Sequence, residues 1–278
     1  EAGITGDSRG NYLRREEGVT VGDINFSANT NDKVGYLYEG ASFASYAGGS
    51  GPNDWLTVYG NAVIRNMTGV EIVSLNAAEV TFDATVSGVN QIAKYADATL
   101  TMTASQLAAV TFVACEGDTT LDIRLSDQAA VTLNGNLGNS TLINSLALNG
   151  DQRLTLRAEQ LEGLGKLTGH EDSREVVTVS TAEGNMAGTF GVDLTGTALE
   201  NVNALVFREV TIIVLMDAAK ITGNTFLQNL GQSGDKLELG NVARACSSAV
   251  QAASAEAVKA VGQWHFDAVS QELVYWAA

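Results

Sequence analysis

The sequence predicts a mainly β protein, built as a parallel β-solenoid in which short strands stack coil upon coil. Three observations predict this fold: an internal echo, a set of recurring short phrases, and a composition suited to strands and turns. The echo is the clearest, because residues 89–107 and 143–161 are near-copies offset by 54 positions. Internal self-similarity indicates stacked units rather than one globular core, and it favours a scaffold over an enzyme.

The two copies of the echo share identical residues at eight positions. These are Asn90/Asn144, Ala93/Ala147, Asp97/Asp151, Leu100/Leu154, Thr101/Thr155, Ala104/Ala158, Gln106/Gln160 and Leu107/Leu161. A shorter phrase, Val-Thr followed by an apolar residue, recurs at 80–82, 110–112, 131–133 and 210–212. A step of about 20 residues is what one coil of a β-solenoid consumes. We therefore expect the offset of the echo to span two or three coils with insertions.

The composition fits short strands joined by tight turns. Hydrophobic residues make up 45% of the chain and aromatic residues only 6%, and there are 29 Gly and a single Pro, Pro52. Val, Ile and Thr favour strands, whereas Gly and Asn favour turns. The chain of 278 residues is long enough for one extended domain or two ordinary ones.

Three segments are expected along the chain. Residues 1–50 are rich in Gly, Asn, Ser and Tyr and show no repeat phrase, which predicts an irregular N-terminal arm that engages a neighbouring subunit. Residues 51–216 consist of short β-branched runs separated by Asn-Gly, Gly-Asp and Gly-Asn turns, which predicts the solenoid itself. Within it, Ala104–Leu107 and Ala158–Leu161 are better helix formers, and we expect single helical turns there at the corners of the coil.

Residues 217–278 are predicted to form a C-terminal cap. The alanine-rich segment 241–262 has an apolar face of small residues and no Gly or Pro before Gly262, which predicts a helix. Residues 263–276 return to alternation between apolar and polar residues, which predicts a closing hairpin with its turn near 270–272.

Charge and hydropathy exclude several classes of partner. The net charge of −16 argues against nucleic acid, because binding it requires neutralisation of phosphates, and against an anionic membrane surface. No apolar run approaches the roughly 18 residues of a membrane-spanning helix. The sequence shows no N-terminal signal peptide and begins with Glu1, so we expect a processed chain or a fragment.

Candidate catalytic residues are few. The cluster His170-Glu171-Asp172 is interpreted as an exposed polar loop, and His265 as a solvent-facing strand residue. Cys115 and Cys246 lie in different contexts and are interpreted as small buried residues rather than a disulfide. Parallel β-helices also host polysaccharide-degrading enzymes, which need clustered carboxylates or an Arg or Lys base on adjacent coils. Basic residues are sparse in the repeat region. The acids here are scattered, and Asp97 and Asp151 are turn residues at equivalent repeat positions that could stack in a ladder. No catalytic residue is therefore assigned.

One segment suggests a metal ion. Residues 48–56, GGSGPNDWL, partly match the calcium-binding nonapeptide GGxGxDxUx, in which Gly-rich turns supply carbonyls and Asp supplies a carboxylate. Asn53 holds the expected Asp position and Asp54 follows it. The copy is single, so Asn53 and Asp54 are the candidate Ca²⁺ ligands of an incomplete site.

The phrases GGSGPNDWLTVYGNAV and NMTGVEIVSLNAAEVTFDATVSGVNQI, with the final SGDKLELGNV and GQWHFDAVSQELVYWAA, resemble those of bacterial surface-layer and repeats-in-toxin-type secreted proteins. The C-terminal stretch is similar to that of large type I-secreted adhesins, whose uncleaved secretion signal is C-terminal. The resemblance implies an extracellular location at the bacterial cell surface. It also implies calcium, although the tandem nonapeptides of that family are absent.

The sequence thus predicts a non-enzymatic extracellular structural protein that self-assembles into a surface layer, sheath or filament, with itself as its partner. The alternative is an adhesin module that binds a cell-surface polysaccharide. A β-helix enzyme that degrades polysaccharide is a further alternative.

Overall fold

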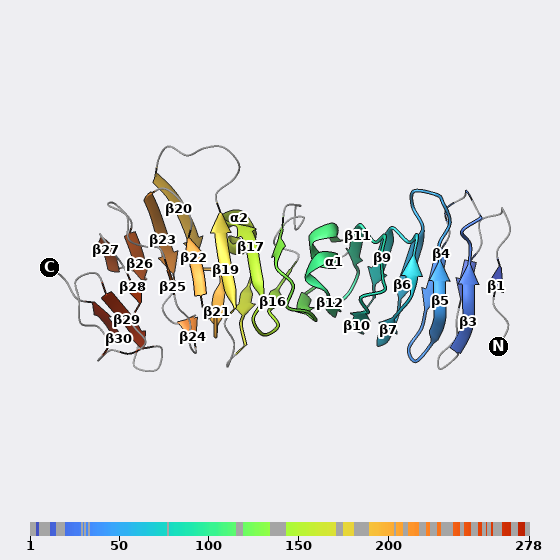
Figure 1. The fold of residues 1–278 in the computed structure, drawn as a ribbon, viewed down its shortest axis with the longest axis horizontal. Helices are drawn as coiled ribbons and strands as arrows, with labels where there is room; N and C mark the ends of the chain where they lie inside the picture. The colour runs from blue at the N-terminus through green and yellow to red at the C-terminus, as the bar shows by residue number, and fades with distance from the viewer. Residues whose placement is uncertain are drawn as a thin grey trace. The chain divides into compact units, whose positions relative to one another are not determined.

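The computed structural model confirms the fold class: the chain is mainly β, and its parallel sheets wind into a β-solenoid (Figure 1). Two short helices, α1 and α2, lie among the described residues. The structure describes residues 4–5, 12–14, 20–28, 30, 32, 34–76, 78–114, 119–133, 143–170, 175–180, 189–202, 204–207, 211–216, 221–222, 227–228, 236–239, 242–245, 250–251, 254, 257, 263–267 and 272–275.

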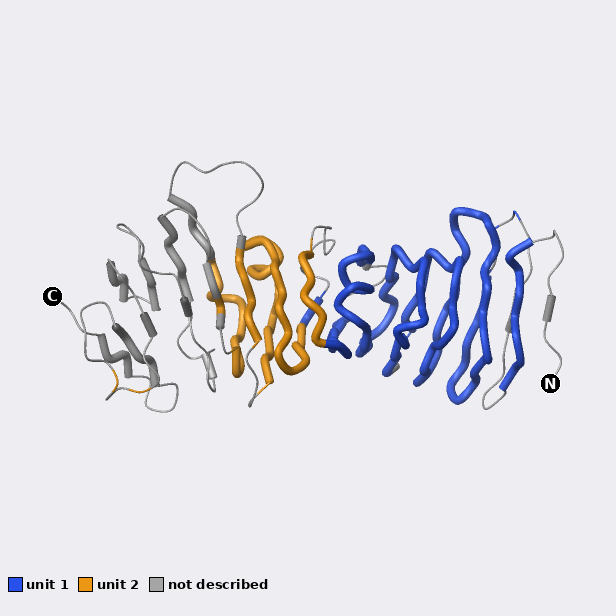
Figure 2. Tube along the Cα trace, in the orientation of Figure 1, with its two compact units in different colours: residues 1–127, 135–144 blue, residues 128–134, 145–278 orange. Residues whose placement is uncertain are grey.

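The chain divides into two compact units, coloured in Figure 2. Unit 1 comprises residues 1–127 and 135–144, and unit 2 comprises residues 128–134 and 145–278.

Unit 1 is built from three sheets of parallel strands, which we name A, B and C. Sheet A contains β1 (Ile4–Thr5), β3 (Thr20–Asn25), β5 (Ser42–Ala47) and β8 (Met67–Thr68). Sheet B contains β2 (Tyr12–Arg14), β4 (Val34–Leu37), β6 (Trp55–Val58), β9 (Ile72–Leu75), β11 (Gln91–Lys94) and β13 (Thr111–Ala114). Sheet C contains β7 (Ala62–Ile64), β10 (Ala78–Phe82), β12 (Ala98–Met102) and β14 (Leu121–Leu125).

Each coil of unit 1 adds one strand to sheet B, and the register gives the length of the coil. The first residues of its strands pair in turn: Val34 with Trp55, Trp55 with Ile72, Ile72 with Gln91, and Gln91 with Thr111. The numbering of these partners confirms the predicted step of about 20 residues per coil. The steps are nevertheless unequal, so the coils differ in length.

The core of unit 1 follows from strand alternation. Leu56 and Val58 point inward and are 2% and 0% exposed, while their strand neighbours Trp55 and Thr57 are half-buried on the outer side. On the next coils Val73 and Ile92 take the position of Leu56, and both are 0% exposed. Burying each such side chain stabilises the fold by about 1.5–3 kcal/mol.

We group the described strands of unit 2 into four sets, which we name sheets D to G. Sheet D contains β16 (Ser145–Ala147), β18 (Lys166–Thr168), β21 (Ala198–Glu200) and β24 (Ile221–Thr222). Sheet E contains β15 (Val131–Thr132), β17 (Arg153–Arg157), β19 (Val176–Ser180), β22 (Ala204–Phe207) and β25 (Leu227–Gln228). Sheet F contains β20 (Thr189–Leu194), β23 (Thr211–Met216), β26 (Lys236–Leu239) and β27 (Val242–Ala245). Sheet G contains β28 (Val250–Gln251), β29 (Gln263–Asp267) and β30 (Glu272–Tyr275).

The echo proves to be a strand–strand–helix unit that occurs once in each unit of the protein. Its first copy forms β11, β12 and α1 (Ala104–Ala109), and its second forms β16, β17 and α2 (Ala158–Glu162). The expectation of single helical turns in these segments is confirmed. β16 lies five strands after β11, so at two strands per coil the offset spans two and a half coils. As a result α1 joins sheet C to sheet B, whereas α2 joins sheet E to sheet D.

The identical residues of the echo hold these corner helices in place. Ala104, Leu107, Ala158 and Leu161 are at most 1% exposed. The amide of Gln106 accepts a hydrogen bond from the Thr103 N–H and donates to the carbonyls of Asp83 and Val86 in the preceding turn. Gln160 repeats the pattern: it accepts from the Arg157 N–H and donates to the Leu133 carbonyl. Folding requirements therefore explain the shared Ala, Gln and Leu of the two corner helices.

The expected irregular arm at residues 1–50 is wrong. β3, β4 and β5 belong to coils of the solenoid and pair in parallel, as Thr20 with Ser42 and Val34 with Trp55 show. Parallel pairing extends from Ile4 with Ile24 to Met216 with Leu239, well beyond the predicted limits of 51–216. The repeat is not visible in the sequence, because any apolar side chain can occupy an inward position. Successive coils therefore need not have identical residues.

The helix expected over 241–262 is also wrong where the structure describes it. β27 pairs antiparallel with β26, with Leu239 opposite Val242, and β28 pairs with β29. The sequence Gly240-Asn241 between β26 and β27 is a two-residue hairpin signal that the alanine content obscured. Tertiary pairing overrides helix propensity here. The closing hairpin is confirmed, since β29 and β30 are antiparallel and Asp267 pairs with Glu272.

Candidate functional site

The outer side of sheet B carries a row of aromatic residues on successive coils of unit 1. Tyr38, Tyr59, Asn76 and Tyr95 each follow the end of a sheet-B strand, and we call these four positions the aromatic row. The N–H of Tyr59 donates to the Leu37 carbonyl at 2.8 Å, and Asn76 and Tyr95 repeat this bond to the coil before them at 2.9 Å each. The four residues therefore occupy the same position on four consecutive coils.

The tyrosine rings of this surface are stacked. The ring centroids of Tyr38 and Tyr59 lie 4.9 Å apart with 9° between their planes, and Tyr36 lies 6.2 Å from Tyr59 at 27°. Offset stacks of this kind contribute about 0.5–1.5 kcal/mol beyond the area they bury. The Tyr59 side of the stack still faces solvent, because Tyr59 is 38% exposed. The rings are thus held in place by one another without being buried.

Trp55 adds a second fixed ring. It begins β6 on the same outer side, and its indole Nε1 donates to the Ser74 hydroxyl on the neighbouring strand β9 at 2.5 Å. Ser74 is fully buried, so this hydrogen bond is shielded from solvent and sets the orientation of the indole ring. A ring fixed before a ligand arrives loses little conformational entropy on binding.

These residues line a shallow groove of about 370 Å³. Its lining consists of Val34, Tyr36, Trp55, Thr57, Tyr59, Asn76 and Tyr95. The seven lining residues are uncharged, although the chain as a whole carries a net charge of −16. Aromatic walls with a few convergent polar groups are typical of small-molecule and glycan sites.

The candidate calcium ligands lie just before β6, and their side chains differ in exposure. Asn53 is exposed, and its backbone N–H and side-chain amide donate to the Asp32 carboxylate on the preceding coil at 3.2 and 3.4 Å. Asp54 is 0% exposed, and its N–H donates to the Glu71 carboxylate at 2.9 Å. Burial raises the pKa of Tyr46, and the nearby Asp54 carboxylate raises it further. In the described ranges no three His, Cys, Asp or Glu side chains group as metal ligands, and calcium stays a prediction.

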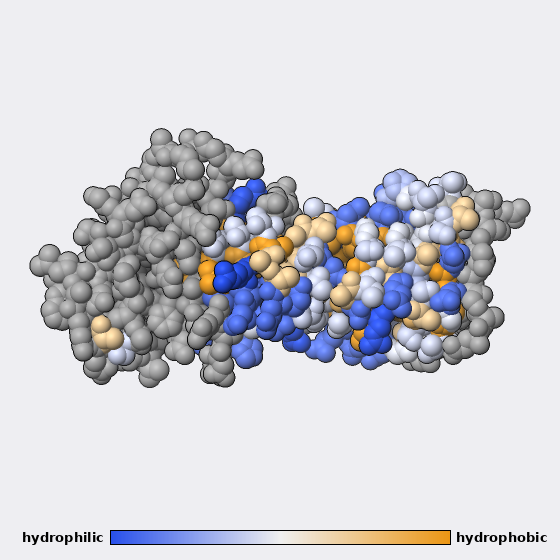
Figure 3. All heavy atoms as spheres, viewed as in Figure 1, coloured by the Kyte–Doolittle hydropathy of each residue, from blue (hydrophilic) through white to orange (hydrophobic). Residues whose placement is uncertain are grey.

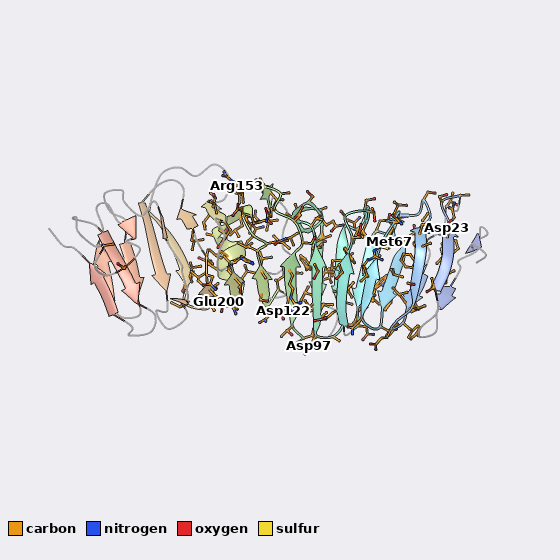
Figure 4. The ribbon with its side chains drawn as sticks, turned by 60° about the horizontal axis from the view of Figure 1, so that its bottom comes forward. Asp23, Met67, Asp97, Asp122, Arg153 and Glu200 are labelled. Atoms are coloured by element: carbon orange, nitrogen blue, oxygen red, sulfur yellow. The ribbon has the colours of Figure 1, made fainter. Side chains whose placement is uncertain are left out.

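Asp97 and Asp151 do not share a ladder. Asp97 lies just before β12 of sheet C, where its carboxylate accepts from the Thr120 N–H at 2.6 Å and the Thr120 hydroxyl at 3.1 Å. Asp151 is exposed and lies just before β17, a strand of sheet E. The half-coil in the echo offset is the cause, because it places equivalent residues in different sheets. Figure 4 shows Asp97 at the same edge of unit 1 as Asp122.

The hydrogen bonds from Thr120 hold the pKa of Asp97 below its usual value of 3.8, with a smaller contribution from the Lys94 ammonium. A lowered pKa means that the ionised form stabilises the fold at neutral pH, and that this contribution disappears as the pH falls through the folded-state value. We expect Asp97→Ala to lower the thermal midpoint at neutral pH and to have a diminishing effect in acid. Thermal unfolding of both proteins across this pH range measures the difference. A difference that stayed constant with pH would contradict the assignment.

Of the polar cluster at 170–172, His170 is exposed, whereas Glu171 and Asp172 lie outside the described residues. Cys115 and Cys246 also lie outside them, and of His265 the structure gives only its strand position opposite Val274. These three interpretations therefore stay predictions.

Sequence reasoning missed the aromatic row, although a signal was present. Four of the seven tyrosines of the chain, Tyr36, Tyr38, Tyr59 and Tyr95, lie on this one surface. The spacing from Tyr38 to Tyr59 is close to one coil, and the spacing from Tyr59 to Tyr95 is close to two. Searching for aromatic residues at multiples of the coil length would have found them.

Over the described part of unit 1, the face drawn in Figure 3 interleaves hydrophilic and apolar residues. Neither α1, α2 nor any other helix among the described residues has the length and apolar character needed to cross a bilayer. Comparison with known proteins found no matching family model, no matching curated protein and no matching solved structure.

Proposed function

We propose that this protein is a glycan-binding module of the bacterial cell surface, an adhesin-like β-solenoid that holds polysaccharide in the groove on sheet B. The observation that carries the proposal is the uncharged groove lined by Tyr36, Trp55, Tyr59 and Tyr95. A pyranose ring presents C–H bonds on its faces and hydroxyl groups around its edge. Aromatic rings contact the faces, while the polar side chains of Thr57 and Asn76 can hydrogen-bond the edge.

The aromatic rings of the groove are held in position, so the groove can bind a ligand without rearranging. Tyr59 is held by its stack with Tyr38, and Trp55 by its hydrogen bond to Ser74. Sugars bind weakly per contact because their hydroxyl groups must give up water. A surface whose rings are already in position keeps more of the contact energy as affinity, so the proposal requires no rearrangement of sheet B.

The proposal is one of binding without turnover. Most glycoside hydrolases place two carboxyl groups on either side of the bond to be cleaved, and the seven groove residues include no carboxylate. The extracellular location belongs to this proposal and rests on the resemblance of the sequence to secreted surface proteins. Self-assembly into a layer or filament stays a separate prediction, and electron microscopy of the purified protein tests it.

The test of binding is affinity electrophoresis in gels that contain neutral or acidic polysaccharides. We expect retardation of the native protein by at least one polysaccharide, and a loss of affinity of about tenfold or more in Trp55→Ala and Tyr59→Ala, because buried aromatic anchors dominate such interfaces. Val63→Ala is the matched control: Val63 is 50% exposed and lies on sheet C of the same unit. Circular dichroism confirms that each variant is folded.

If no polysaccharide retards the native protein, the proposed function is wrong. It is equally wrong if Trp55→Ala and Tyr59→Ala migrate like the Val63→Ala control in every gel.

A further inference from the structure

The aromatic row has an aromatic ring on three of its four coils and lacks one on the coil of Asn76. Neighbouring strands of a sheet lie about 4.8 Å apart, and the 4.9 Å between the rings of Tyr38 and Tyr59 matches one such step. The next coil places Asn76 in the row, and the coil after it places Tyr95. A ring is therefore present on the first, second and fourth coils and absent on the third.

The interval above Asn76 has the length of one ring. The row positions of Tyr59 and Tyr95 are two coils apart, which corresponds to about 9.6 Å along the sheet. In the Tyr38–Tyr59 stack one step accommodates one ring. Both Tyr59 and Tyr95 line the groove together with Asn76, so the interval is part of the open surface.

We propose that this interval is a subsite for one uncharged pyranose residue of the bound polysaccharide, held between Tyr59 and Tyr95 above Asn76. The inference rests on the proposed function and deepens it, because it names the ring that the groove holds and the class of glycan. The sugar ring occupies the position above Asn76, where the row has no aromatic ring.

The polar groups of the groove favour a sugar over an aromatic side chain of a partner protein. Thr57 and Asn76 both contribute to the lining. An apolar ring placed over them would remove water from an amide and a hydroxyl without replacing its hydrogen bonds, which is unfavourable. The hydroxyl groups at the edge of a pyranose can replace them.

The charge of the protein favours a neutral sugar over a uronic acid. No lining residue is a cation that could pair with a carboxylate. Two charged residues are adjacent in sequence to tyrosines of the row: Glu39 is exposed and accepts from the Asn61 amide at 3.5 Å, whereas Lys94 is only 3% exposed. Together with the net charge of −16, this disfavours an acidic polysaccharide.

The test is to place an aromatic side chain of the protein itself at position 76. Asn76→Tyr places a ring in the interval, so we expect it to fold normally, to raise the thermal midpoint, and to lose affinity for neutral oligosaccharides by about tenfold or more. Asn76→Ser is the matched control, because it leaves the interval open and keeps a polar group there. Thr81→Tyr, at an outward position of sheet C, controls for an added tyrosine that does not enter the groove.

The probes are neutral hexose oligosaccharides of increasing length, a polyuronate, and a peptide rich in Tyr and Trp, with binding measured by calorimetry. Neutral oligosaccharides bound by the native protein and by Asn76→Ser, but not by Asn76→Tyr, support the subsite. Two outcomes overturn it while leaving glycan binding intact. These are equal binding by Asn76→Tyr and the native protein, or a preference for the polyuronate. A groove that takes up the aromatic peptide but no glycan overturns the proposed function as well.

Discussion

Replacing Gly48 with alanine is expected to destabilise unit 1 more than the same substitution at Gly35 or Gly60. The new Cβ would lie 1.7 Å from the backbone oxygen of Gly69 and 2.6 Å from its carbonyl carbon. Gly48 also donates its N–H to the Thr68 carbonyl at 2.8 Å, so the two coils are tied together at the point of the clash. Gly69 itself has a φ of +61°, which few other residues adopt.

The clash involves backbone on both sides, so relief requires the coils to separate. We expect Gly48→Ala to lower the free energy of unfolding by about 4 kcal/mol or more, the range of the most disruptive substitutions. Urea unfolding followed by circular dichroism measures the change. Gly196→Ala is the matched control, because a Cβ there meets no atom of the described residues within 4 Å, and we expect a change below about 0.5 kcal/mol. Similar unfolding midpoints for the two variants would show that the coils at Gly48 are not in close contact.

Replacing Gln106 or Gln160 with leucine is expected to release the corner helices of the echo. The Gln106 amide bonds the Thr103 N–H at 2.8 Å and the carbonyls of Asp83 and Val86 at 2.9 and 3.0 Å. Leucine is apolar and one bond shorter, so it leaves these backbone groups unpaired, at about 1–3 kcal/mol for each group that water does not reach. We expect each substitution to lower the free energy of unfolding by about 2–4 kcal/mol.

Ser105→Ala controls for the Gln106 substitution, because Ser105 is exposed on the same helix. Hydrogen exchange at α1 and α2 shows whether stability is lost only at the substituted corner, because each glutamine bonds the backbone at its own helix. Were Gln106→Leu no more destabilising than Ser105→Ala, the identity of Gln106 and Gln160 in the echo would need another explanation.

The substitutions of Gln106 and Gln160 also test whether these repeated residues serve folding or ligand binding. If Gln106 and Gln160 serve folding, their loss changes stability without a direct effect on the groove, because neither residue lies in its lining. The groove substitutions Trp55→Ala and Tyr59→Ala are expected to act in the opposite way. Measuring both properties on all four variants distinguishes a folding residue from a binding residue.

The solenoid fold, the approximate length of its coils and the helical corners were predictable because they are local properties. Val-Thr phrases, Asn-Gly and Gly-Asp turns and the Ala-x-Gln-Leu segments each specify a short element by propensity. The closing hairpin of β29 and β30 was predictable for the same reason. The coils formed by residues 20–50 were not, because their inward positions accept any apolar side chain and leave no repeated letters.

Propensity misled at 241–262. The composition of that segment favours a helix, yet Val242–Ala245 completes the edge of sheet F beside β26. An exposed strand edge offers backbone hydrogen bonds to any nearby segment that can extend. A short segment of Val, Ala and Arg can adopt either form, and pairing with the edge decides between them.

The sequence by itself determined that short strands would stack in coils of about 20 residues. Only the tertiary structure decided what those coils bring together on the outside. Tyr38, Tyr59, Asn76 and Tyr95 share a row because coils of unequal length bring them into register, and the register is set by backbone pairing across sheet B. The same pairing placed Asp97 and Asp151 in different sheets. Coil lengths vary, so which outer residues align depends on the lengths of all the coils between them. A local sequence pattern does not contain this information.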